Sequence, residues 1–200
     1  GIYGARQIMD ITHPVYRYYG ERVIRKLMEV SAHRKCVIGF QLDNETKYYD
    51  TAGKNVQEQF VKYLRTKFND DWRGYSYGVQ PMVDHKHAAR ALTVAGVDIY
   101  HPTQDELTGA EISYGGDSTR SLKADNYFVL ETEAQGFPGW VPYDGQLRLQ
   151  AFSHLASGAN MVEYWHWHSI HNSFETYWKG LLSHDFKENA VYKEAEIIGN

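Results

Sequence analysis

An alternation of amphipathic helix and short apolar strand restricts the fold of this chain more than any other feature. In segment 14–31 the apolar residues recur at three- and four-residue steps, which predicts a helix, and a short apolar run follows at 36–40. Further apolar runs lie at 95–100, 126–130 and 161–165. Helices that alternate with buried strands indicate a parallel α/β architecture, so we expect these strands to be parallel and to end at a common edge.

Other segments complete this pattern. Segment 103–125 is polar and contains consecutive glycines, and it is predicted to be a loop. Pro14 suits the first turn of its helix, with Thr12 or His13 as the N-cap. The other predicted helices run from about Val56 to Asn69, begin at Pro81, span 146–157 with Gly158 as the C-cap, and span 191–198.

Acidic residues directly follow two of the apolar runs. Asn44 and Glu45 follow the first, and Glu131 and Glu133 follow the run at 126–130. Barrel enzymes build their active sites from side chains at strand ends, although an Asn- and Asp-rich turn would also explain the first cluster. Two such glutamates suit glycoside hydrolysis, in which one carboxyl protonates the leaving oxygen and the other attacks, or activates water at, the anomeric carbon.

Three later motifs join the Asn44-Glu45 pair in a fixed order. They are VDIYHP at 97–102, GQLRLQ at 145–150 and YWHWH at 164–168. With these motifs the chain resembles the family-42 glycoside hydrolases, which are β-galactosidases. The resemblance implies a retaining enzyme that hydrolyses terminal non-reducing β-D-galactosides by double displacement.

The resemblance also implies an α/β fold, the (β/α)8 TIM barrel, with only its C-terminal portion represented. Such a barrel takes about 250 residues, and this chain has 200. Relatives carry another helix and strand before the WRGY segment at 72–75, so we expect an internal shortening near residues 69–72. Residues 1–200 would then form a single, incomplete catalytic domain.

The resemblance assigns roles to six residues. Glu45 matches the acid/base residue, and Glu131 matches the nucleophile. Glu133 is a rival to Glu131, because strand alternation puts both on one face. Relatives also place a His shortly after the residue that Glu175 matches, where this chain has Trp178. The expected substrate-binding residues are Asn44, Tyr100, Trp140 and Glu175.

Composition narrows the possible partners. The formal net charge of −4 gives no indication of nucleic acid, and no apolar run approaches membrane-spanning length. The single cysteine, Cys36, cannot form an intrachain disulfide or a cysteine zinc cluster, and we expect it to pack as a small apolar residue. No metal or other cofactor is expected. The N-terminus shows no signal-peptide pattern, which favours a cytoplasmic location.

Two other readings of the function stay open at this point. A barrel fragment could keep sugar-binding residues without turnover, or a related β-glycosidase or α-L-arabinopyranosidase could share the Asn-Glu device. The expected partner is a galactoside or oligosaccharide substrate. Because open strand edges invite association, and because the family is often trimeric, we also expect a homo-oligomer.

Overall fold

The chain divides into two compact units, Gly1–Val83 and Asp84–Asn200. The computed structural model describes residues 10–42, 44, 53–68, 84–135, 139–172 and 175–200. The first unit contains helices α1 (Pro14–Ser31) and α2 (Lys54–Phe68), and the second contains all of the described strands. The division leaves open whether residues 1–200 form one catalytic domain, which stays a prediction.

Helix α1 begins and ends at the residues that its sequence predicts. The His13 side chain accepts a hydrogen bond from the Val15 N–H at 3.2 Å, and Pro14 occupies the first helical turn, where its missing N–H costs nothing. No residue of α1 is buried, and Val23 is 65% exposed. The apolar stripe that defines the helix in the sequence therefore lies uncovered among the described residues.

The predicted strand at 36–40 is wrong for this structure, since these residues form no strand. Ile38 and Leu42 are 81% and 80% exposed, and Cys36 is exposed too, so the prediction that Cys36 packs in an apolar interior is also wrong. A parallel strand needs hydrogen-bonding neighbours, and the described residues offer only the sheet of the second unit. An apolar sequence alone does not form a strand without such neighbours.

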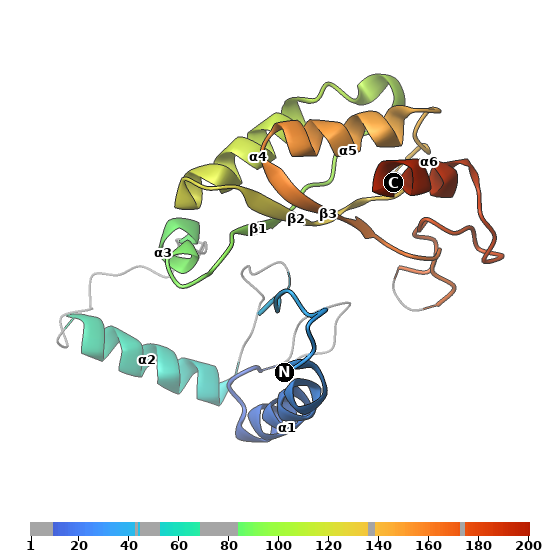
Figure 1. Ribbon diagram of the computed structural model, residues 1–200. Helices are drawn as coiled ribbons and strands as arrows, with labels where there is room; N and C mark the ends of the chain where they lie inside the picture. The colour runs from blue at the N-terminus through green and yellow to red at the C-terminus, as the bar shows by residue number, and fades with distance from the viewer. Residues whose placement is uncertain (1–9, 43, 45–52, 69–83, 136–138, 173–174) are drawn as a thin grey trace. The chain divides into compact units, whose positions relative to one another are not determined.

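The sheet of the second unit confirms the other three predicted strands. It consists of β1 (Gly96–Asp98), β2 (Tyr127–Glu133) and β3 (Ala159–Trp165) in the order β1-β2-β3, and both pairings are parallel. The carboxyl ends of the strands consequently lie on the same side of the sheet (Figure 1). The predicted α/β architecture is confirmed for this unit, whereas the C-terminal portion of a (β/α)8 barrel stays a prediction.

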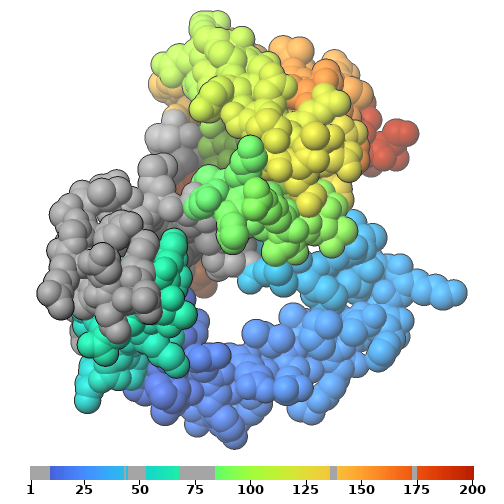
Figure 2. All heavy atoms as spheres, turned by 90° about the vertical axis from the view of Figure 1, so that its left-hand side faces the viewer, coloured from blue at the N-terminus to red at the C-terminus, as the bar shows by residue number. Residues whose placement is uncertain are grey.

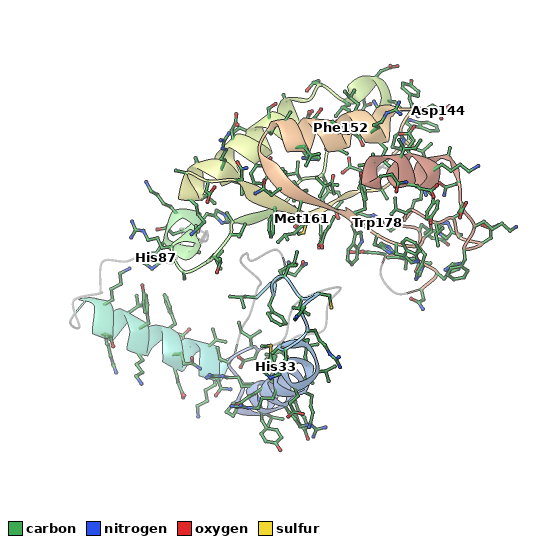
Figure 3. All side chains as sticks on the ribbon, viewed as in Figure 1. His33, His87, Asp144, Phe152, Met161 and Trp178 are labelled. Carbon is green, nitrogen blue, oxygen red and sulfur yellow. The ribbon has the colours of Figure 1, made fainter. Side chains whose placement is uncertain are left out.

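Helices α4 (Ala110–Lys123) and α5 (Gln146–Ala156) lie over one face of the sheet, and α6 (Ala190–Gly199) packs against α5 (Figure 1). Met161 projects from β3 on the opposite face (Figure 3). Gly158 ends α5 with a φ of 102°, as a glycine C-cap should. The Glu194 carboxylate of α6 accepts hydrogen bonds from the Gly145 and Arg148 N–H groups at the start of α5. Those N–H groups have no partner within the helix, so α6 caps α5.

The predicted loop at 103–125 is wrong, because it contains α4 and a short 3-10 helix, η1 (Gln104–Glu106). The buried face of α4 consists of Ile112, Gly116 and Thr119, which recur at helical spacing but include only one large apolar residue. A Cβ atom added at Gly116 would lie 2.3 Å from the Tyr127 hydroxyl oxygen, so the glycine allows the helix to approach the sheet. Close packing against the sheet requires small residues on the inner face of α4. The sequence therefore lacks the apolar periodicity that would predict this helix.

The short helix α3 (His85–Ala89) lies at the C-terminal end of α4 (Figure 2). The Lys123 ammonium donates hydrogen bonds to the carbonyl oxygens of Ala89 and Leu92 at 3.0 and 2.7 Å. The Ala89 carbonyl also accepts from the Leu92 N–H at 3.2 Å, so the lysine adds a second donor at the end of α3. The predicted start of this helix at Pro81 is wrong, because Asp84 lies outside the helix as its N-cap, accepts a hydrogen bond from the His87 N–H, and makes His85 the first helical residue; residues 81–83 lie outside the described residues.

A bulge interrupts β2 just before the predicted catalytic glutamate. Val97 and Asp98 are consecutive in β1, but their partners in β2 are Val129 and Glu131. The pairing with β3 shifts in the same region. Bulges change the direction of side chains next to active sites. Because of this bulge, the alternation of side chains along a regular strand does not determine whether Glu131 and Glu133 lie on the same face.

Candidate active site

Glu131 lies at the bulge of β2, is partly exposed, and contacts the end of β1. The Tyr100 hydroxyl donates a hydrogen bond to Glu131 Oε2 at 2.9 Å. The backbone of the two segments is also joined, because the Ile99 N–H donates to the Glu131 carbonyl at 2.9 Å. The predicted pairing of Tyr100 with Glu131 is therefore present in the structure.

Tyr100 is held in its protonated form. Burial, together with the negative charge of Glu131, raises the pKa of Tyr100 far above its usual value of about 10. The hydroxyl is therefore a permanent donor at any pH at which the protein works. A donor of this kind stabilises the ionised form of the carboxyl that accepts from it.

Glu175 and Trp178 come from the segment after β3. The edge of the Trp178 ring meets the Tyr100 ring at a centroid distance of 5.8 Å and an interplanar angle of 76°. The Trp165 indole N–H, at the end of β3, donates to Glu175 Oε2 at 3.3 Å. Trp178 lies near the carboxyl end of β3 (Figure 3). The Trp178 N–H donates to the Glu175 carbonyl at 2.9 Å, so Trp178 connects the segment of Glu175 to Tyr100, which in turn contacts Glu131.

Trp140 lies on the loop between β2 and α5, and its position is fixed by its backbone. Its carbonyl accepts a hydrogen bond from the Thr103 hydroxyl, and the Lys179 ammonium donates to the neighbouring Gly139 carbonyl at 3.5 Å. The Trp140 residue itself is 75% exposed. The structure places Trp140 beside the loop that follows β1, with its ring open to solvent.

Glu133, the rival acid, is completely buried. Its carboxylate accepts from His101 Nδ1 at 2.7 Å and from the Thr132 hydroxyl at 3.2 Å, and both side chains of the His101–Glu133 pair are 0% exposed. Sequence reasoning missed the part played by His101, for which the only signal was its position at the end of an apolar run. A carboxylate enclosed in this way cannot touch a substrate.

The first acidic cluster lies in the other unit. The Asn44 Oδ1 atom accepts a hydrogen bond from the Gln41 side-chain amide at 3.1 Å, while Glu45 lies outside the described residues. The structure therefore brings together Tyr100, Glu131 and Glu175, and the roles of Asn44 and Glu45 stay predictions.

The described residues contain neither a metal-binding cluster nor a membrane-spanning helix. None of their histidine, cysteine and acidic side chains form a group of three or more that could hold a metal ion. No helix in the described ranges combines the length and the apolar character needed to cross a membrane.

Comparison with protein families gives one clear match. The family model Glyco_hydro_42, described as beta-galactosidase, matches residues 2–74 and 72–200. These two segments meet beside the shortening expected near residues 69–72. The chain is 32% identical over 107 residues to beta-galactosidase BgaH of Haloferax lucentense, which covers 50% of this chain and 16% of that protein. It is 26% identical over 129 residues to beta-galactosidase LacZ of Heyndrickxia coagulans, which covers 62% of this chain and 19% of that protein.

Comparison with solved structures supports the same fold. Gan42B, a GH42 beta-galactosidase from G. stearothermophilus, matches 94% of this chain with a TM-score of 0.79 and 17% sequence identity, and the match spans 40% of that chain. The beta-galactosidase of the psychrophilic Marinomonas ef1 matches 57% of this chain with a TM-score of 0.51 and 22% identity. The chain thus spans less than half the length of the proteins that it matches.

Proposed function

The chain belongs to the Glyco_hydro_42 β-galactosidase family, and from that premise we propose that it acts in a retaining enzyme that hydrolyses terminal non-reducing β-D-galactosides. In the proposed mechanism Glu131 attacks the anomeric carbon while Glu45 protonates the leaving oxygen. Water then hydrolyses the glycosyl-enzyme, with Glu45 acting as the general base. Glu175 and Asn44 would hold sugar hydroxyls.

The Tyr100–Glu131 hydrogen bond is the observation that carries this proposal. A nucleophilic carboxylate must be ionised and reachable, and Glu131 is partly exposed at the carboxyl edge of a parallel sheet with a permanent donor on it. Glu133 is not accessible to a substrate, and its carboxylate oxygens already accept hydrogen bonds from His101 and Thr132. The geometry therefore favours Glu131 over Glu133 as the nucleophile.

Hydrolysis of 4-nitrophenyl β-D-galactopyranoside by the chain tests the proposal. We expect release of nitrophenolate, and proton NMR of the first product should show β-galactose before mutarotation, because two inversions restore the starting configuration. Glu131→Gln supplies the blank. If α-galactose is the first product, the retaining mechanism is wrong.

One observation favours a second candidate, a fragment without turnover. The apolar face of α1 and residues Ile38 and Leu42 are exposed among the described residues, as they would be if they required further parts of a barrel. The same assay separates the candidates, since an inert fragment releases no nitrophenolate. Rates with 4-nitrophenyl α-L-arabinopyranoside, measured in parallel, test the alternative that the chain is an α-L-arabinopyranosidase. A homo-oligomer and a cytoplasmic location stay predictions.

Tyr100→Phe is expected to lower kcat/KM about 10- to 100-fold, because a hydrogen bond to a charged group contributes about 1.5–3 kcal/mol. The acid limb of the pH profile should also move to higher pH, since the ionised carboxylate loses a donor. Initial rates across pH measure both effects. Tyr114→Phe, at a 78% exposed tyrosine of α4, is the matched control. Equal profiles for the two variants would contradict a role for Tyr100.

A further inference from the structure

The buried carboxylate of Glu133 has no role in the proposed chemistry. It accepts three hydrogen bonds, from the His101 backbone N–H at 3.2 Å, from His101 Nδ1 at 2.7 Å and from the Thr132 hydroxyl at 3.2 Å. Three donors favour the ionised form of a carboxyl group. An ionised carboxylate in the interior is costly unless a positive charge pairs with it, so the neighbouring charges decide its state.

His101 is the titratable group in contact with Glu133. Its Nδ1 faces two acceptors, Glu133 Oε1 and, at 3.2 Å, the Pro102 carbonyl, so this nitrogen must carry a proton. Within the described ranges no lysine or arginine forms an ion pair with Glu133. Burial disfavours the imidazolium, but the hydrogen bond and the charge of Glu133 outweigh burial and raise the pKa of His101.

The helices over the sheet add two titratable groups. From α4, the negative charge of Glu111 acts in the same direction as Glu133. From α5, the ring of His154 lies 5.7 Å from the His101 ring. Burial and the charge of His101 lower the pKa of His154 to about 4, so His154 stays neutral. His101 and Glu133 are therefore the two members of this buried cluster that the proposal concerns.

The pair also replaces a missing backbone contact between β1 and β2. The Ile99 N–H donates to the Glu131 carbonyl, and in a regular parallel ladder the His101 N–H would donate to the Glu133 carbonyl next. It donates instead to the Glu133 side chain. Tyr100 thus lies between two anchored N–H groups, and its hydroxyl reaches Glu131 from that fixed position.

We propose that His101 and Glu133 form a buried imidazolium–carboxylate pair that positions Tyr100 against Glu131 and in which His101 offsets the negative charge of Glu133. Both are positioning residues. The inference about catalysis rests on the proposed function, because it assumes that Glu131 is the nucleophile. The inference about the charged pair does not depend on whether the chain hydrolyses a substrate.

The first test measures the protonation of His101 without any assay of activity. Two-dimensional NMR of 15N-histidine-labelled protein, with the His101 ring assigned through its backbone, should show an imidazolium at about pH 7.5, roughly one unit above the usual pKa of histidine. In Glu133→Gln, which keeps an acceptor oxygen but loses the charge, the ring should be neutral at that pH. A neutral His101 in the unmodified protein overturns the proposal, whatever the chain hydrolyses.

The second test is a double-mutant cycle read from the pH profile of kcat/KM. His101→Asn leaves a negative charge near Glu131, so the acid limb should move up by about one pH unit. Adding Glu133→Gln removes that charge, and the limb should return toward its original position even if the rate stays low. A residue that only supports the fold would lower the rate without moving the limb.

The control for the cycle is His87→Asn, at an exposed histidine of α3. It should leave both the rate and the limb unchanged. If the double variant keeps the shifted limb of His101→Asn, the charge of Glu133 is not the cause and the proposal fails. An inactive chain with a charged His101–Glu133 pair would instead count against the proposed function and against Tyr100 acting on a nucleophile.

Discussion

Glu131→Gly lowers hydrolysis of the chromogenic β-galactoside by about four orders of magnitude or more, on the scale seen when an enzyme loses its nucleophile. Without the carboxylate no glycosyl-enzyme can form. Water must then displace the leaving group directly, in one difficult step instead of two easier ones. Azide should restore part of the rate by entering the space left by the side chain. Because it attacks the face opposite the leaving group, the product should be the α-galactosyl azide, which NMR identifies.

Two further variants serve as controls for the restoration of activity by azide. Glu188→Gly, at an exposed loop residue before α6, should keep full activity and form no azide product. Glu45→Ala should give the β-azide, because azide then attacks the galactosyl-enzyme in place of water that needs a general base. Finding the two anomers exchanged would exchange the roles of Glu45 and Glu131. Unchanged activity of Glu131→Gly would remove Glu131 from the chemistry.

Helix ends were the most predictable part of the fold, because local signals set them. Pro14, the cap at His13 and the glycine at 158 act within a few residues of where they stand in the sequence, and the structure places α1 and the end of α5 accordingly. The parallel order of β1, β2 and β3 was also predicted, since their apolar runs suit strands buried on both faces.

The wrong predictions for segments 36–40 and 103–125 have non-local causes. The run at 36–40 is as apolar as the strands that form, but it has no pairing partner among the described residues. Helix α4 has a weak apolar pattern because Gly116 must leave room for Tyr127, which comes from another element. Neither the missing partner nor the close approach can be read from the segment itself.

The candidate site divides in the same way. The contact of Tyr100 with Glu131 was predicted from resemblance, and the register of β1 against β2 accounts for it. The bulge in β2 lies beside Glu131, and no residue in that strand predicts a bulge from the sequence. Sequence reasoning therefore could not separate the surroundings of Glu131 from those of Glu133. The burial of His101 against Glu133 depends on how the segment after β1 lies beside β2, so sequence reasoning could name the residues but not their pairing.

Gly180→Ala is expected to destabilise the second unit by about 1–3 kcal/mol, the range for overpacking, and to fall at its upper end. The added Cβ would lie 2.5 Å from the His168 carbonyl carbon and 2.6 Å from the His166 carbonyl oxygen. These are backbone atoms, which cannot rotate away as a side chain can. Urea unfolding followed by tryptophan fluorescence measures the loss as a lower midpoint with an unchanged slope.

The same substitution should also weaken substrate binding, because Gly180 joins the segment of Glu175 to the end of β3. Its N–H donates to the Ser169 hydroxyl at 3.1 Å, and the following Leu181 N–H donates to the His166 carbonyl at 2.7 Å. Moving this segment outward would lengthen the Trp165–Glu175 contact, so KM should rise more than kcat falls. Gly199→Ala, where an added Cβ meets nothing within 4 Å, is the matched control. Equal unfolding midpoints for the two variants would show that the tight approach at Gly180 is not needed for stability.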